Sequence, residues 1–174
     1  MVHSVELLFD AETDAAVRRL WDDLSDNGIR SLAGHRSESN MPHVTVTVAE
    51  DMDDAVDEAL RPVVKGLPLG CVLGAPMLFG RGRAVTLVRL VVPSAKLLEL
   101  HAAVHRICLP HMAGGVLPHA EPRQWTPHVT LARRVPLELV PVALAVPGVT
   151  DDIAASATAL RHWDGNAKVV HPIG

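Results

Sequence analysis

The tetrapeptide Pro-His-Val-Thr occurs twice in this chain of 174 residues, at positions 42–45 and again at positions 127–130. Each copy lies in a segment where polar and apolar residues alternate, which is typical of a half-buried β-strand. Side chains two residues apart point to the same face of a strand, so the histidine and threonine of each copy lie side by side. The repeat therefore predicts two similar halves, each presenting an imidazole beside a hydroxyl group.

Strand periodicity assigns the neighbours of these residues to faces. In the first copy, His43, Thr45 and Thr47 are predicted to share one face, and in the second copy His128 and Thr130 do so. If a pseudo-twofold axis relates the halves, both polar faces line one cleft. The opposite faces are aliphatic, with Val44, Val46, Val48, Val129 and Leu131.

Two imidazoles and two hydroxyl groups around one small anion suit the cleavage of a phosphodiester. One histidine, when neutral, removes a proton from the attacking water or ribose hydroxyl, and the other, as imidazolium, protonates the leaving oxygen. Both states are accessible near pH 7 because the ordinary pKa of histidine is about 6.5. The threonine hydroxyls can donate to the non-bridging oxygens. This scheme needs no metal and no cofactor.

Patterns on either side of the repeat predict the remaining elements. The order is a strand at 3–9, a helix at 10–27, a polar loop at 31–40, a strand at 41–48, a helix at 53–65, a hairpin of strands 69–79 and 83–92 around the turn 80–82, a helix at 94–109, a Gly/Pro-rich loop at 111–126, a strand at 127–133, and closing strands at 153–163 and 168–173. The state of residues 137–146, which Pro141 interrupts, stays open. This order indicates an α+β fold with mainly antiparallel sheets.

Composition limits the class of protein. The chain is long enough for one domain, or for two small lobes that share a cleft. A net charge of −4 and scarce aromatic residues argue against non-specific binding of long nucleic acids. Cys71 and Cys108 are expected to be reduced thiols. The N-terminal sequence lacks signal-peptide features and no apolar run is long enough to span a bilayer, so we expect a cytoplasmic protein with no membrane partner. We also expect the protein to be a monomer.

The paired histidine–threonine motifs, one in each half of the chain, resemble those of the 2H phosphoesterase superfamily, in particular its 2′-5′ RNA ligase and cyclic phosphodiesterase branch. The resemblance implies one bilobal, pseudo-symmetric domain over residues 1–174, with two mainly antiparallel sheets flanking a central cleft and helices outside. It implies hydrolysis of 2′,3′-cyclic phosphates or 2′-5′ phosphodiesters at an RNA terminus or in a small cyclic nucleotide. His43 and His128 match the catalytic histidines, and Thr45 and Thr130 match the phosphate-binding residues.

Further substrate contacts are less specific in the sequence. Arg36 precedes the first motif in a polar loop, Trp125 precedes the second motif and is as suited to stacking on a base as to covering the core, and Arg134 falls on the His128 side of its strand. Arg133 is predicted to face away from the cleft. His111 and His119 flank a loop that could border it.

Two alternatives remain. One is a non-catalytic RNA- or nucleotide-binding module that uses the same cleft. The other is a metal-dependent hydrolase that uses His101 and His105, which are spaced i, i+4 on a predicted helix. We favour a solvated helix face for that pair, because no acidic residue or cysteine accompanies it. His3, His35, His162 and His171 have no sequence context that singles them out.

Overall fold

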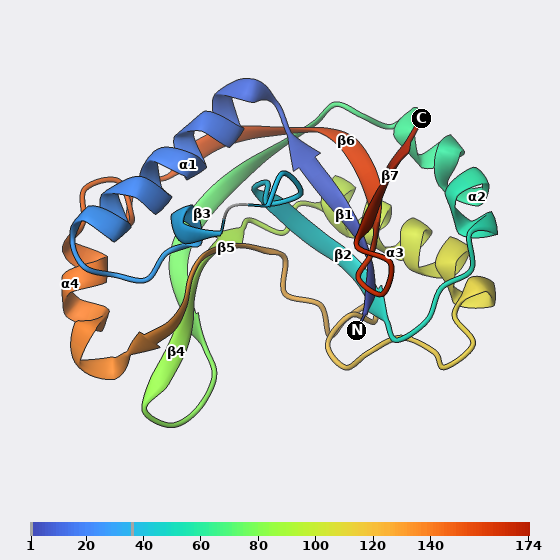
Figure 1. The fold of residues 1–174 in the computed structure, drawn as a ribbon. Coiled ribbons are helices and arrows are strands. Elements are labelled where there is room, and N and C mark those ends of the chain that lie inside the picture. The colour runs from blue at the N-terminus through green and yellow to red at the C-terminus, as the bar shows by residue number, and fades with distance from the viewer. Residues whose placement is uncertain (1, 36) are drawn as a thin grey trace.

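The computed structural model describes residues 2–35 and 37–174, and its elements follow the predicted order (Figure 1). Three short 3-10 helices, η1 (Leu32–Gly34), η2 (Leu109–His111) and η3 (Leu137–Leu139), join the main elements. The strands and α-helices are β1 (His3–Phe9), α1 (Ala11–Asp26), β2 (His43–Ala49), α2 (Ala55–Val64), β3 (Leu69–Phe79), β4 (Ala84–Val91), α3 (Ala95–Cys108), β5 (His128–Pro136), α4 (Val140–Ala145), β6 (Ile153–Asp164) and β7 (Val169–Ile173).

The seven strands of the described residues form one antiparallel sheet, in which six follow the order β2-β1-β6-β3-β4-β5 and β7 pairs with β6. The long strand β6 joins the halves, because one of its edges pairs first with β3 and then with β7. The two expected sheets are thus the arms of one continuous sheet, which curves into an arch (Figure 1). The edge strands β2 and β5, which carry the two motifs, contact each other.

The helices begin where the sequence provides a cap. The Asp10 carboxylate accepts a hydrogen bond from the Thr13 amide at the start of α1, and the Ser94 hydroxyl does the same for the Leu97 amide in α3. Residues 137–146, left open by the sequence, form η3 and α4. Pro141 lies in the first turn of α4, where its missing N–H interrupts no helical hydrogen bond.

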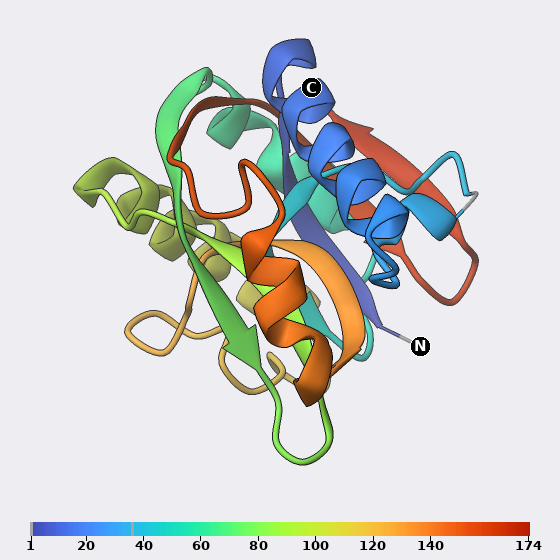
Figure 2. The ribbon, with the colours of Figure 1, turned by 90° about the vertical axis from the view of Figure 1, so that its left-hand side faces the viewer.

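Each motif strand packs against a helix from the other half of the chain. Helix α1 follows β1 yet packs against β5, and α3 follows β4 yet packs against β2. Figure 1 shows α1 and α4 at one end of the arch and α2 and α3 at the other, and Figure 2 presents the α1–α4 side to the viewer. Both views show the β3–β4 hairpin projecting beyond the sheet. Within the described residues, no helix is long and apolar enough to cross a membrane.

Candidate active site

Both motif strands contain a β-bulge one residue after the threonine. In β2, Thr45 pairs with Glu6 and Thr47 with Val5, so Val46 is passed over in the register. In β5, Thr130 pairs with Val88 and Ala132 with Leu87, so Leu131 is passed over. A bulge inserts one residue into a strand and therefore reverses the alternation of side chains beyond it.

The reversal corrects two predictions. Thr47, expected beside His43, is fully buried, and Val48 faces the site in its place. Arg133, expected to face away, lines the same hollow as His43 and Thr45. Strict alternation failed at both positions because the bulges turn Val48 and Arg133 towards the site.

The two motif threonines are held through their carbonyl groups. The Trp125 indole donates to the carbonyl oxygen of Thr45 at 2.9 Å, and the Trp21 indole donates to that of Thr130 at 3.0 Å. Trp21 belongs to α1, whereas Trp125 lies in the loop before β5. Each motif is thus fixed by a tryptophan from the other half of the chain.

The two imidazoles are anchored in the same way. Nδ1 of His43 donates to the Met41 carbonyl and Nδ1 of His128 donates to the Thr126 carbonyl, both at 2.7 Å. Because a carbonyl oxygen only accepts, the neutral form of each ring carries its proton on Nδ1. In both rings Nε2 is therefore the atom that can exchange a proton with a substrate.

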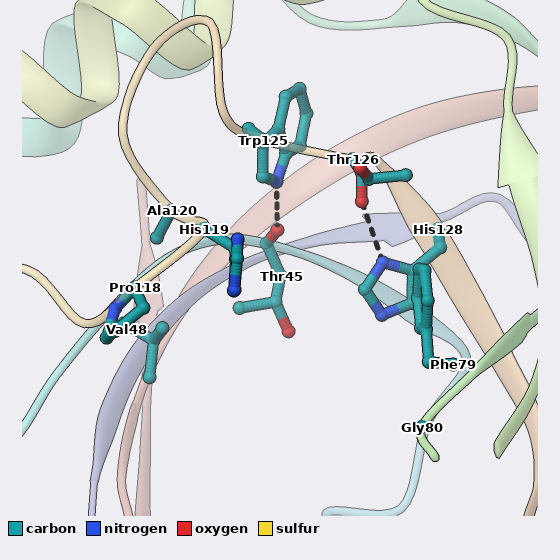
Figure 3. Close-up of a pocket in the computed structure, with 10 residues that line it drawn as sticks. All are labelled: Thr45, Val48, Phe79, Gly80, Pro118, His119, Ala120, Trp125, Thr126 and His128. Carbon is teal, nitrogen blue, oxygen red and sulfur yellow. Dashed lines mark hydrogen bonds between the residues drawn. The ribbon is translucent and has the colours of Figure 1, made fainter. Parts of the chain in front are cut away.

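Two adjoining hollows form the groove between the motifs, and both are lined by Thr45 and Val48. The apolar hollow, of about 520 Å³, contains His128 (Figure 3). The polar hollow, of about 400 Å³, contains His43. Other residues lining the apolar hollow include Phe79, Pro118, His119, Ala120 and Trp125, and those lining the polar hollow include Glu6, His35, Arg133 and Arg161.

His43 lies beside a buried ion pair. Its Nε2 is 3.7 Å from Oε1 of Glu6, while Oε2 of Glu6 accepts a hydrogen bond from Nε of Arg161 at 2.7 Å and forms an ion pair with a terminal nitrogen of Arg161, also at 2.7 Å. The Ser4 hydroxyl donates to Oε1 at 2.7 Å. This fixed carboxylate attracts a positively charged His43 ring, although Arg161 offsets part of its field.

His128 lies in a different environment. The Phe79 ring meets it edge-on, with 4.8 Å between ring centroids (Figure 3). Burial lowers the pKa of His128 below the usual 6.5, and the positive charges of His43 and Arg133 lower it further, against the opposing effect of the Thr126 carbonyl. His128 is thus suited to the neutral form.

The other residues predicted to contact the substrate do not lie together in one hollow. Trp125 lines the apolar hollow, but one face of its indole stacks on His101 with centroids 4.0 Å apart. Thr130 is half-buried and lines neither hollow of the groove, and Arg134 lines only a third hollow, with Arg133. Arg36 lies outside the described residues.

The helical pair His101 and His105 is not the expected solvated face. His101 is 2% exposed, and its Nε2 lies 3.0 Å from the Ala120 carbonyl oxygen. Burial lowers the pKa of His101, and hydrogen bonds to the backbone of Ala120 and Val46 oppose that effect. Because its ring is held by Trp125 and by the backbone, His101 serves packing rather than metal binding.

Sequence reasoning missed several groove residues, namely Glu6, Phe79 and Arg161. Glu6 and Arg161 oppose each other on neighbouring strands, a pairing between residues 155 positions apart that no local pattern reveals. His119, expected near the cleft, lines the apolar hollow, whereas His111 pairs with Asp53 at 2.9 Å and lines neither hollow.

Comparisons with known structures place the fold. The chain resembles E. coli LigT at 15% identity, covering 99% of this chain and 94% of LigT with a TM-score of 0.59. It resembles TT0787 of Thermus thermophilus at 12% identity (100% and 96% covered, TM-score 0.58) and Kluyveromyces marxianus Usb1 at 12% identity (98% and 97% covered, TM-score 0.56). At these identities the likeness shows the fold alone.

Sequence comparison gives the family. No curated protein sequence matches the chain. The sequence profile described as the 2′-5′ RNA ligase superfamily matches residues 9–165, a range that includes both motifs and β6, the strand that joins the halves. The match confirms the relationship expected from the paired motifs, and the chain therefore belongs to the 2′-5′ RNA ligase superfamily of 2H phosphoesterases.

Proposed function

We propose that this protein is a metal-independent phosphoesterase that hydrolyses 2′,3′-cyclic phosphate or 2′-5′ phosphodiester bonds of RNA ends or nucleotides. The observation that carries the proposal is the pair of imidazoles, anchored alike through Nδ1, at the two hollows of one groove. LigT has been crystallised with 3′-AMP and Usb1 with uridine monophosphate, which are ligands of the proposed class. We further propose that the protein is monomeric and cytoplasmic.

We assign His128 as the general base and His43 as the general acid for hydrolysis of the cyclic phosphate. The lowered pKa of His128 keeps its Nε2 free of a proton near neutral pH. The Glu6 carboxylate lies 3.7 Å from Nε2 of His43, so the proton that an acid donates would lie next to a negative charge. The two roles thus follow from two different surroundings of the same motif.

In the proposed reaction, water attacks phosphorus opposite the ribose oxygen that leaves. Nε2 of His128 takes the proton of the water as the new P–O bond forms. The P–O bond to the ribose breaks, and Nε2 of His43 gives its proton to the departing oxygen, leaving a phosphomonoester and a free ribose hydroxyl. A proton then returns from solvent to His43 as His128 releases its own. Ligation is the same attack on the cyclic phosphate with a ribose 5′-hydroxyl in place of water, and its reverse is cleavage of the 2′-5′ bond.

We place the phosphate at Thr45, where the two hollows meet. The Thr45 hydroxyl and the Arg133 guanidinium would hold the non-bridging oxygens as negative charge develops. The apolar hollow, lined by Phe79, Pro118 and Trp125, would take the ribose and base. We keep Thr130 as a second phosphate-binding hydroxyl, which requires its side chain to reach the groove beside His128 when substrate binds.

The test is hydrolysis of a panel of nucleoside 2′,3′-cyclic monophosphates and a 2′-5′-linked dinucleotide in excess EDTA. Wild type, His43→Ala and His128→Ala are compared with His111→Ala, a control whose side chain lines neither hollow of the groove. Each catalytic variant should lose roughly a hundredfold or more in kcat, the usual cost of removing a general acid or base. The control should match wild type.

Other results would contradict the proposal. Loss of wild-type turnover in EDTA, restored by a divalent metal, would indicate metal-dependent chemistry. Saturable binding of a cyclic nucleotide without turnover, weakened in the two histidine variants, would instead establish a binding module that uses the same groove.

A further inference from the structure

The third hollow, of about 440 Å³, adjoins the groove on its polar side. It shares Leu32, His35 and Arg133 with the polar hollow and no residue with the apolar one. Its other lining residues are Arg30, Ser31, Gly34 and Arg134. The three hollows therefore follow one another, with Thr45 between the apolar and polar hollows and Arg133 between the polar and third hollows.

Three arginines gather in the third hollow of a protein whose net charge is −4. No carboxylate lines it within residues 2–35 and 37–174. In the same ranges, none of the three guanidinium groups forms an ion pair, whereas those of Arg18, Arg61 and Arg161 do. Like charges gathered in this way repel one another unless an anion lies between them. The third hollow thus has the charge of an anion-binding site.

A second bulge in β5 brings two of these arginines together. Arg133 and Arg134 both oppose the single residue Thr86 of β4. Consecutive residues of a regular strand point to opposite faces, yet both arginines line the third hollow. The φ angle of Arg134 is 55°, in the left-handed region that residues other than glycine seldom adopt. Backbone of this kind gathers at functional sites, where the surrounding structure holds it in place.

The third arginine, Arg30, comes from the segment after α1. Its neighbours Ile29 and Ser31 are buried, and Ser31 forms an isolated β-bridge with Ala132 of β5. The Ser31 hydroxyl also donates a hydrogen bond to the Trp21 carbonyl. Because the residues on both sides are fixed, the backbone of Arg30 is held beside the bulge while its side chain stays exposed. Two segments far apart in the sequence thus build one basic hollow.

We propose that the third hollow binds a second phosphate group of the substrate, one nucleoside beyond the scissile phosphate. The placement rests on the proposed function, in which the scissile phosphate lies at Thr45 and its nucleoside in the apolar hollow. The other side of that phosphate then faces the polar hollow, whose volume of about 400 Å³ is within the usual range for a small-molecule site. A second nucleoside in the polar hollow would carry its own 3′-phosphate into the third hollow.

The arginines divide between the two phosphates. Guanidinium groups suit phosphate because they donate paired hydrogen bonds to its oxygens. Arg133 lines both the polar and the third hollow, so it can contact either phosphate. Arg30 and Arg134 line neither hollow of the groove and would contact only the second phosphate. The preferred substrate is therefore a 2′-5′-linked oligonucleotide with a phosphate 3′ to the second nucleoside, whereas a cyclic mononucleotide leaves the third hollow empty.

The test compares cleavage of 2′-5′-linked diadenosine with no terminal phosphate, with a 3′-terminal phosphate, and with a 5′-terminal phosphate. The two phosphorylated isomers have the same charge, so net charge cannot cause a preference between them. Wild type should cleave the 3′-phosphorylated isomer with a kcat/KM roughly tenfold or more above the other two, as expected for hydrogen bonds to a charged group. Arg30→Gln and Arg134→Gln should each reduce this preference to less than about threefold. The control Arg106→Gln, at an exposed position of α3, should keep it.

The outcomes separate this proposal from the proposed function. Equal cleavage of the two isomers would overturn the second phosphate site and leave the proposed function standing. A preference for the 5′-phosphorylated isomer, or a preference undiminished in both arginine variants, would also overturn the site.

Absence of dinucleotide cleavage would leave the cyclic nucleotides to judge the proposed function and calorimetry to judge the third hollow. Tighter binding of the 3′-phosphorylated isomer than of the 5′-phosphorylated one, lost in Arg134→Gln, would then support the site. Equal binding of the two isomers by wild type would overturn it.

Discussion

The two copies of the motif have the same backbone and different neighbours. Both histidines bond through Nδ1 to the carbonyl two residues earlier, and both strands bulge after the threonine. The residue paired with the threonine differs, however. It is Glu6 in the first copy and Val88 in the second. One position on the neighbouring strand thus decides whether a charged or an apolar group lies beside the motif.

The comparison shows how the same motif in two strands could serve the acid and the base of the proposed mechanism. The shared anchor presents Nε2 in each ring, so geometry alone does not distinguish them. The Glu6–Arg161 pair lies beside His43, whereas Phe79 and burial act on His128. In the proposed mechanism, the different roles of the two rings therefore come from residues outside the repeated tetrapeptide.

The largest expected effect on stability comes from Glu6→Gln. The substitution leaves the Arg161 guanidinium buried without its counter-charge, which typically costs about 3–5 kcal/mol. The retained amide oxygen places the expected loss near the lower end, about 3 kcal/mol. Urea denaturation measures it, with Asp14→Asn as the control, because the partly exposed Asp14–Arg18 pair should cost less than about 1 kcal/mol. Equal losses of unfolding free energy in Glu6→Gln and Asp14→Asn would contradict the view that Glu6 is a buried counter-charge beside the first copy of the motif.

The two tryptophans test the shared anchor of the motifs. Trp21→Phe removes the donor to a buried carbonyl, that of Thr130, and should lower the free energy of unfolding by about 1–3 kcal/mol. Trp125→Phe removes the matching donor to Thr45 at a half-buried position, where water can replace it, so the loss should be smaller. A larger loss for Trp125→Phe in urea denaturation would refute this order.

Arg133 and Arg134 test the effect of the bulge on binding. Arg133→Gln should raise KM for a cyclic nucleotide roughly tenfold, as expected when a hydrogen bond to a charged group is lost. Arg134→Gln should change KM less than about twofold, because that side chain lines a different hollow. Steady-state kinetics measures both, and the reverse result would mean that substrate lies along the third hollow.

The acid limb of the pH–rate profile tests the apolar side of the second copy. His128 must be neutral to act as a base, and its lowered pKa places the acid limb of kcat/KM below about pH 6.5. Phe79→Ala admits water to the ring, raises the pKa of His128 towards its usual value and moves the limb to higher pH. Leu78→Ala, at an exposed neighbour, should leave the limb unchanged. A limb that does not move in Phe79→Ala would exclude desolvation as the cause.

Sequence periodicity was sufficient for the order of the elements and for placing His43 and Thr45 on the same side of their strand. The first limit of sequence periodicity was the two β-bulges, because the register of a strand depends on the strand with which it pairs. Val46 and Leu131 are ordinary strand residues, and no local pattern indicates that either is passed over. The faces predicted for Thr47 and Arg133 were therefore wrong, because each residue lies beyond a bulge.

Long-range contacts were the second limit. His3 and His162 are 159 positions apart and meet because β1 and β6 are neighbours in the sheet. Glu6 and Arg161 meet for the same reason. Without the strand order, no local pattern singles out these residues, although they form a buried histidine pair on one face of the sheet and a fixed carboxylate on the other.

The most direct test of the unequal roles uses two substrates that differ only in the leaving group. One is a nucleoside phosphodiester with an alkyl alcohol as leaving group, and the other carries p-nitrophenol, which leaves without protonation. His43→Ala should lose roughly a hundredfold or more on the alkyl ester and recover most of that activity on the nitrophenyl ester, because no acid is needed. His128→Ala should remain impaired on both. Recovery in His128→Ala instead of His43→Ala would reverse the assignment, and equal losses on both substrates in both variants would contradict acid–base catalysis by this pair.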